Sequence, residues 1–163
     1  MLACWLLFVL GVYVRGFVPR CRRGLSAFRP WRACSFALGL FVLWAALSSP
    51  LDAYGGYLLS VHMAQHFLLM MIVPPLVLLG NPGVPLLMGV SKAFRQKWLE
   101  PLLASAVVRR SAGFAVRPIV GWLSLAAVTW VWHLPVLYRL GLVSASWHRF
   151  EHVCFLAAGF AFW

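Results

Sequence analysis

Five long apolar blocks constrain the fold of this chain more than any other feature of its sequence. The blocks cover approximately residues 1–14, 31–47, 57–79, 118–138 and 147–163. Apolar stretches of this kind are typical of helices that cross a bilayer, whereas β-barrel strands are shorter and alternate apolar with polar residues. Charged residues make up only 10% of the chain, far below the roughly 25% that soluble domains carry. We therefore expect a single all-α domain, a polytopic transmembrane helical bundle of about five spans.

The basic residues gather in two of the connections between these blocks and set the expected orientation. Of the 14 Lys and Arg residues, twelve lie in or beside the connections 15–30 and 80–117. The positive-inside rule places such clusters on the cytoplasmic side of a membrane, so we expect both connections inside and the N-terminus outside. The net charge of +11 therefore indicates contact with anionic lipid headgroups and not with nucleic acid. Residues 91–99 form an amphipathic segment that should lie along the inner headgroup surface.

This topology brings all five histidines into the outer half of the expected bundle. They are His62 and His66 in the third block, His133 in the fourth, and His148 and His152 in the fifth. The two histidines of the first pair are four residues apart, and so are the two of the last pair, so the members of each pair share a helix face. Two facing helices that each present a histidine pair can close a metal site, with the fifth histidine arriving from a third helix.

The side chains at this depth favour a transition metal. Imidazole suits copper, zinc, iron and nickel, and thioether sulfur favours Cu(I). Met70 and Gln65 lie on the first histidine stripe and Glu151 on the second. We therefore expect these three side chains to orient the metal ligands. A single HxxxH pair is more often helix-packing glue. Two pairs and a fifth histidine at one depth favour a functional site, because ionisable groups inside a membrane are rarely idle. We hypothesise bound copper, with Cu(I) favoured.

The remaining polar residues do not assemble a catalytic site. The chain has three acidic residues, and its sequence offers no Gly-rich phosphate loop, Ser–His–Asp arrangement or paired-carboxylate site. We therefore expect a binding protein and not an enzyme. The four cysteines show no CxxC or other paired spacing and are interpreted as small apolar fillers of helices. Asp52 is interpreted as a solvated loop carboxylate.

Three stretches of the sequence are similar to a known family. They are Ser49–Asp52 continuing through His62–Met70, Pro74-Pro75 and Gly80–Pro82; Trp132–Tyr138; and Trp147–His152 followed by Phe155–Gly159. In this order, over roughly residues 36–163, they resemble the CtaG-like (caa3-type) family of cytochrome c oxidase assembly proteins. These are multi-span bacterial membrane proteins, distinct from the single-span copper chaperone that shares the name. The segment 84–116 resembles the family in its basic character and not residue by residue. Family members have about seven spans, so we expect the chain to be part of a longer protein.

The resemblance implies a role in the assembly of haem–copper oxidases, with delivery of copper to the catalytic copper centre of the large subunit. On this basis the five histidines are the candidate copper ligands. The protein would be a multi-pass protein of the bacterial cytoplasmic (inner) membrane. Its partners would be the lipid bilayer, the copper ion and cytochrome c oxidase subunits.

Three other interpretations of the histidines stay open. A membrane cytochrome would hold haem between histidines of facing helices, for instance His66 and His152. A copper transport or resistance protein would need a polar route to the inner face, yet below His66 the third block offers only Met70, Met71 and apolar residues. A structural scaffold would use the histidines for packing alone. Metal content and visible absorbance distinguish these alternatives from copper delivery.

Overall fold

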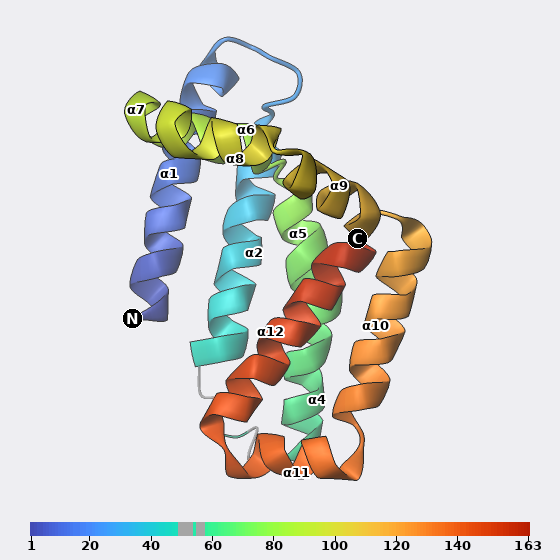
Figure 1. The fold of residues 1–163 in the computed structure, drawn as a ribbon. Helices are drawn as coiled ribbons and strands as arrows, with labels where there is room; N and C mark the ends of the chain where they lie inside the picture. Colours follow the sequence, from blue (N-terminus) through green and yellow to red (C-terminus); the bar gives the residue numbers. More distant parts are fainter. Residues whose placement is uncertain (49–53, 55–57) are drawn as a thin grey trace.

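The chain folds into a bundle of helices. The computed structural model describes residues 1–48, 54 and 58–163, and 86% of these residues are helical, with no strand among them. The all-α fold expected from the sequence is therefore confirmed. Asp52 lies outside the described residues. Figure 1 shows the longer helices running along the bundle, with shorter helices laid across both of its ends.

Among the residues that the structure describes, three helical segments are long and apolar enough to cross a membrane. They are α1 (Leu2–Arg22), α2 (Pro30–Ser48) and the continuous run of α4 (Leu59–Phe67), η1 (Leu68–Ile72) and α5 (Val73–Leu79). A fourth is reached only if α9 (Ala106–Ala115) and α10 (Pro118–Trp132), which are bent by 72° at the break between them, count as one span. The structure thus gives three or four candidate spans, and the expected five stay a prediction.

The fifth expected span corresponds to α12 (Ala145–Phe162), which packs against α10 and η1. The first half of α12 carries polar side chains, and these keep its mean hydropathy below that of the three candidate spans. They are His148, Arg149, Glu151 and His152. The polar residues that keep α12 out of the candidate spans are therefore mostly the same residues that the sequence marks as functional.

The first helix is longer than the sequence predicted. The expected span ended at residue 14 and was followed by a connection, but α1 continues to Arg22. Basic side chains near the end of a membrane helix extend along it to reach polar surroundings, so the helix need not stop where the arginines begin. The guanidinium of Arg20 donates to the carbonyl of Gly16 one turn back, at 2.7 Å, so this arginine is satisfied by its own helix.

The fourth helix ends earlier than expected. The apolar block 118–138 predicted one span, but α10 stops before His133. Leu134 adopts an extended backbone with a ψ of 134°, as is usual for a residue that precedes proline. Pro135 then begins a new helix, α11 (Pro135–Val143), in the first-turn position that suits a residue without an N–H. Figure 1 shows α11 lying across the end of the bundle, so His133 stands in the turn between two helices.

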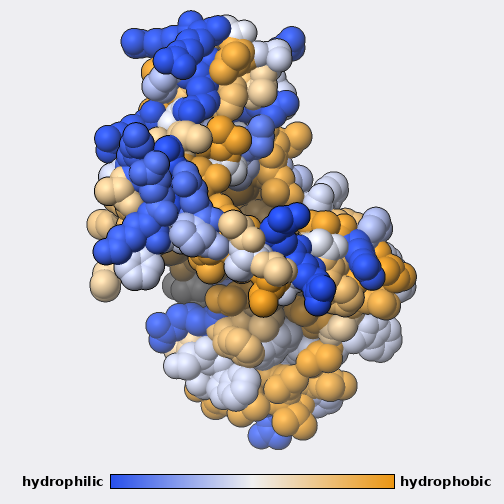
Figure 2. Space-filling view, turned by 45° about the horizontal axis from the view of Figure 1, so that its top comes forward, coloured by the Kyte–Doolittle hydropathy of each residue, from blue (hydrophilic) through white to orange (hydrophobic). Residues whose placement is uncertain are grey.

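The basic segment crosses the opposite end of the bundle. It comprises α6 (Gly83–Gly89), α7 (Lys92–Phe94), η2 (Arg95–Leu99) and α8 (Glu100–Ala104). Figure 1 shows these helices lying across the ends of α1 and α2, and Figure 2 shows hydrophilic side chains gathered over this end. The helix expected at 91–99 is therefore confirmed, and its contact with lipid headgroups stays a prediction.

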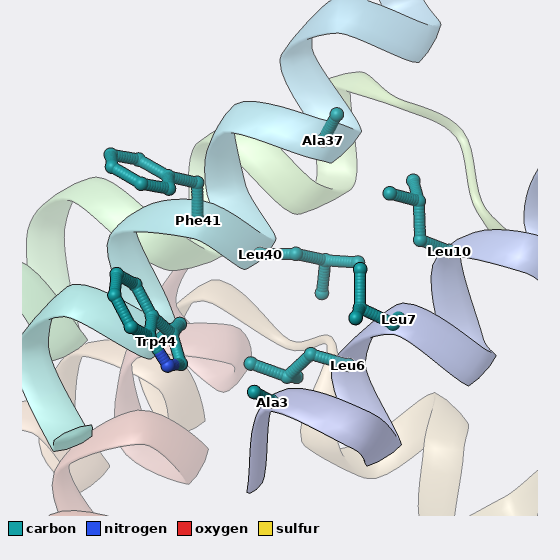
Figure 3. A pocket seen from close by; sticks show the side chains of 8 residues that line it. All are labelled: Ala3, Leu6, Leu7, Leu10, Ala37, Leu40, Phe41 and Trp44. Atoms are coloured by element: carbon teal, nitrogen blue, oxygen red, sulfur yellow. The ribbon is translucent and has the colours of Figure 1, made fainter.

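The long helices leave much apolar surface exposed. Phe8 on α1 is 61% exposed and Phe41 on α2 is 59% exposed. The two helices border an apolar groove of about 310 Å³, shown in Figure 3 with the leucines of α1 facing Leu40, Phe41 and Trp44 of α2. Apolar patches of this extent are rare on soluble monomers. They fit helices that face lipid, where no water has to be ordered around them.

The π-helical turn η1 holds α12 against the helical run that extends from α4 to α5. Pro74 has no N–H and therefore leaves the carbonyl of Met70 without its helical partner. The indole of Trp163 donates to this carbonyl at 3.2 Å. Gly159 packs on the same turn so closely that a Cβ there would lie 2.8 Å from the Met70 carbonyl oxygen. These contacts hold α12 beside the α4–η1 segment, and so place the two histidine-bearing helices next to each other.

Candidate metal site

Two helices place the histidine pairs opposite each other. α4 carries His62 and His66, and α12 carries His148 and His152. Within each pair the ring centroids lie 4.2 Å apart. Across the helices, the centroids lie 5.3 Å apart for His62 and His148 and 5.5 Å apart for His66 and His152. The four rings form a closed quadrilateral, and the facing arrangement that the spacing predicted is confirmed.

Glu151 places its carboxylate among these rings. It is only 2% exposed. Its Oε1 lies 3.5 Å from His66 Nε2 and 3.9 Å from His62 Nε2, and its Oε2 lies 3.6 Å from His148 Nδ1. These separations are too long for hydrogen bonds. One donor atom each from His62, His66 and Glu151 can be chosen so that all three lie within 4.8 Å of one another, which is the spacing of donors that share one cation.

Five of the eight imidazole nitrogens of the cluster are buried without a hydrogen-bond partner among the described residues. Both ring nitrogens of His62, both of His66, and Nε2 of His152 are buried and have no hydrogen-bond partner among the described residues. An unsatisfied buried polar group costs about 1–3 kcal/mol, and native proteins rarely retain several together. Buried lone pairs that converge beside a carboxylate are the donor set that a transition metal requires. The residues present therefore fit a metal ion.

His133, the fifth predicted ligand, lies outside this cluster. Its side chain is exposed, and its Nδ1 is hydrogen bonded to the carbonyl of Thr129 at 2.6 Å. The reason is the early end of α10, which turns His133 into a helix-terminating residue that bonds back to its own helix. Its role as a ligand stays a prediction that the observed geometry does not favour.

Gln65 and Met70, the other two predicted supporting residues, make contacts to neighbouring helices. Gln65 is completely buried and donates from Nε2 to the carbonyl of Ala46 at 2.8 Å, which ties α4 to α2. The sulfur of Met70 lies 4.0 Å from the hydroxyl of Thr129 on α10, which donates its proton to the carbonyl of Leu125 at 2.8 Å. A preference for Cu(I) based on this thioether is therefore not supported by the geometry, and it stays a prediction.

Three residues of the site were not predicted. Phe155 stacks on His66 with ring centroids 4.1 Å apart, Tyr138 meets His62 edge to face at 6.3 Å, and a Cβ on Gly141 would lie 2.9 Å from Glu151 Oε2. Phe155 could have been found, because it lies three residues after His152 on one helix face. No signal in the sequence placed α11 over the site, so the contacts of Tyr138 and Gly141 could not have been predicted.

Comparison with known families identifies the chain. The family model described as cytochrome c oxidase caa3 assembly factor (Caa3_CtaG) matches residues 11–163. The chain belongs to this family. The resemblance stated from the sequence motifs is confirmed, and the match includes every histidine of the cluster.

The curated relatives of this assembly-factor chain are mycobacterial. An uncharacterized protein of Mycobacterium leprae (strain TN) is 31% identical over an alignment that covers 95% of this chain and 24% of the relative. Uncharacterized proteins of Mycobacterium bovis and Mycobacterium tuberculosis are each 30% identical, over 93% of this chain and 23% of theirs. The chain thus spans about a quarter of the length of the relatives it matches. No solved structure matches it.

Proposed function

We propose that this chain binds a copper ion between α4 and α12 and passes it to a cytochrome c oxidase subunit during assembly. The ligands would be drawn from His62, His66, His148 and His152, with Glu151 as a further ligand or as the carboxylate that orients them. The ion is cargo, so the protein acts as a metallochaperone and not as an enzyme. Membership of an oxidase assembly family supports the destination, since the oxidase itself needs copper.

One observation carries the proposal, namely the five buried imidazole nitrogens that have no hydrogen-bond partner within the described part of the chain. A scaffold that used these histidines for packing would be expected to bond them to carbonyls or hydroxyls, as His133 is bonded to Thr129. Neutral imidazole is the form that binds metal, and it costs less than a charge in an apolar medium. A bound cation would also neutralise the buried carboxylate of Glu151, whose ion-pair contacts among the described residues are with imidazoles.

The distribution of charge supports an orientation for the site. The basic segment lies at the end of the bundle opposite α11, and clusters of Lys and Arg mark the cytoplasmic side. In this orientation the histidine cluster lies in the outer half of the bacterial cytoplasmic membrane. The protein would then be a multi-pass inner-membrane protein that receives copper from the outer side of this membrane.

Haem fits the cluster less well than a single ion. The carboxylate of Glu151 approaches histidines of both helices to within 4 Å, so it occupies the space between α4 and α12 that a porphyrin ring would need. A bis-histidine haem would therefore require Glu151 and the α11 backbone above it to move. A single metal ion requires only small movements of the ring planes.

The proposal predicts that the chain binds copper without acquiring a haem spectrum. The chain is purified in detergent, loaded with Cu(I) and freed of excess metal, and its copper content and visible absorbance are measured. We expect about one copper per chain, as the single donor cluster implies, and no Soret band. A Soret band in the purified protein, or a copper content no higher than that of a control membrane protein, would overturn the proposal.

A further inference from the structure

The histidine cluster is closed toward the α11 end of the bundle. Gly141 has no side chain, and the Cβ of any other residue would lie 2.9 Å from Glu151 Oε2. The backbone of α11 therefore rests directly on the carboxylate. Tyr138, from the same helix, covers His62 with its ring edge. Within the described part of the chain, α11 acts as a cover over this end of the site.

The cluster is also closed toward the basic end. Phe155 stacks on His66 at 4.1 Å, and both Phe155 and Leu69 are 0% exposed. Ala46 belongs to the same buried apolar cluster. An ion that crossed the layer would leave its ligands for a medium without polar groups, which is costly for any charge. Movement of metal along the bundle axis is therefore disfavoured in both directions.

Among the described residues, a groove leaves one side of the cluster accessible. A groove of about 560 Å³ lies between the start of α1, the end of α2 and the first half of α12. Its walls include Leu2, Leu47, Ser48 and Val153, and two of the four clustered histidines, His148 and His152. Neither His62, His66 nor Glu151 lines it. The groove therefore reaches the metal cluster from the α12 side only.

Exposure within the cluster is concentrated at His148, because His152, which also lines the groove, is only 4% exposed. The side chain of His148 is 21% exposed, whereas those of Glu151, His62 and His66 are 3–4% exposed. His148 also contacts the buried carboxylate, with 3.6 Å between its Nδ1 and Glu151 Oε2. His148 is thus the one cluster histidine that combines contact with the inner donors and partial access from outside.

We propose that copper enters and leaves the site sideways through this groove, and that His148 is the ligand that exchanges it with the donor or acceptor. The inference rests on the proposed copper-delivery function. Metal transfer between two proteins proceeds by replacement of ligands one after another, so it needs a ligand that an incoming donor atom can approach. His148 meets this need, while His62, His66 and Glu151 retain the ion from behind.

The proposal is tested by substitutions that narrow or widen the groove and leave the proposed metal ligands unchanged. Val153 lines the groove on α12 and is 61% exposed, so it is replaced in the series Val153→Ala, Val153→Phe and Val153→Trp. Val131→Trp is the matched control, because Val131 is an exposed valine on α10 outside the groove. Each variant is loaded with Cu(I), and the release of copper to an excess of bathocuproine disulfonate is followed by absorbance. The copper content before release reports whether the site has folded.

We expect an unchanged copper content and a release rate that falls as residue 153 grows, by about tenfold between Val153→Ala and Val153→Trp, the barrier change being about 1.4 kcal/mol. Val131→Trp should release copper at the original rate. Equal rates across the series, with copper bound normally, would overturn the lateral route alone. A chain that binds no copper before any substitution would overturn the proposed function and this inference with it.

Discussion

Replacing His62 and His66 together with alanine lowers the affinity of the chain for Cu(I) by at least about 100-fold, the upper end of what loss of a supporting partner costs a metal site. These two side chains supply four of the five buried ring nitrogens without hydrogen-bond partners. Their removal leaves only the α12 pair and the carboxylate, which approach the ion from one side. Competition with a chromogenic Cu(I) chelator measures the affinity.

His133→Ala is the informative control for this experiment. The sequence places His133 with the other four histidines, whereas the structure bonds it to Thr129 and exposes it. We expect His133→Ala to bind copper within about twofold of the unaltered chain, as for most exposed substitutions away from a site. A loss of affinity in His133→Ala that equals the loss in the double variant would contradict the four-histidine cluster and restore the arrangement that the sequence suggested.

Glu151→Gln is expected to change metal affinity and metal-free stability in opposite directions. Glutamine keeps the shape of the side chain and removes its charge. Copper affinity should fall about 10–100-fold, because a carboxylate that contacts three imidazoles orients them or binds the ion itself. Without metal, a buried carboxylate beside neutral imidazoles costs free energy, so the metal-free Glu151→Gln chain should melt at the same temperature or higher.

Thermal melting in detergent, with and without copper, separates these two effects. Glu100→Gln is the matched control, since Glu100 is exposed and pairs with Arg95 at 3.1 Å at the other end of the bundle. It should leave copper affinity unchanged. A metal-free Glu151→Gln chain that melts well below the unaltered one would mean that Glu151 stabilises the fold by its charge and would argue against its role in metal binding.

The part of the site that the sequence predicted is the part set by local periodicity. Residues four apart share a helix face wherever a helix forms, so the two histidine pairs and Glu151 were placed correctly once α4 and α12 were recognised as helices. Their meeting across the bundle followed from the expected topology. The positions of these helices relative to each other depend further on Gly159 and Trp163 packing on the π-helical turn at Met70, which no periodicity reveals.

The errors come from signals that compete along one stretch of chain. Residues 118–138 read as one apolar span, yet Leu134-Pro135 ends the helix, and this single break removes His133 from the cluster and creates α11. The block 1–14 was interpreted as a short span because the arginines that follow it were taken to mark the end of the helix. The helix in fact continues through them to Arg22. The contact of Gly141 with Glu151 joins residues whose proximity depends on that unexpected turn.

X-ray absorption spectroscopy of the copper-loaded chain tests the central claim most directly, because it reports the atoms bound to the metal. A site between α4 and α12 predicts a first shell of nitrogen or oxygen atoms with the outer-shell scattering of two or more imidazole rings, and this signal should be lost in the His62→Ala, His66→Ala double variant. A first shell dominated by sulfur, or an imidazole signal that survives in the double variant, would contradict the facing histidine pairs as the copper site.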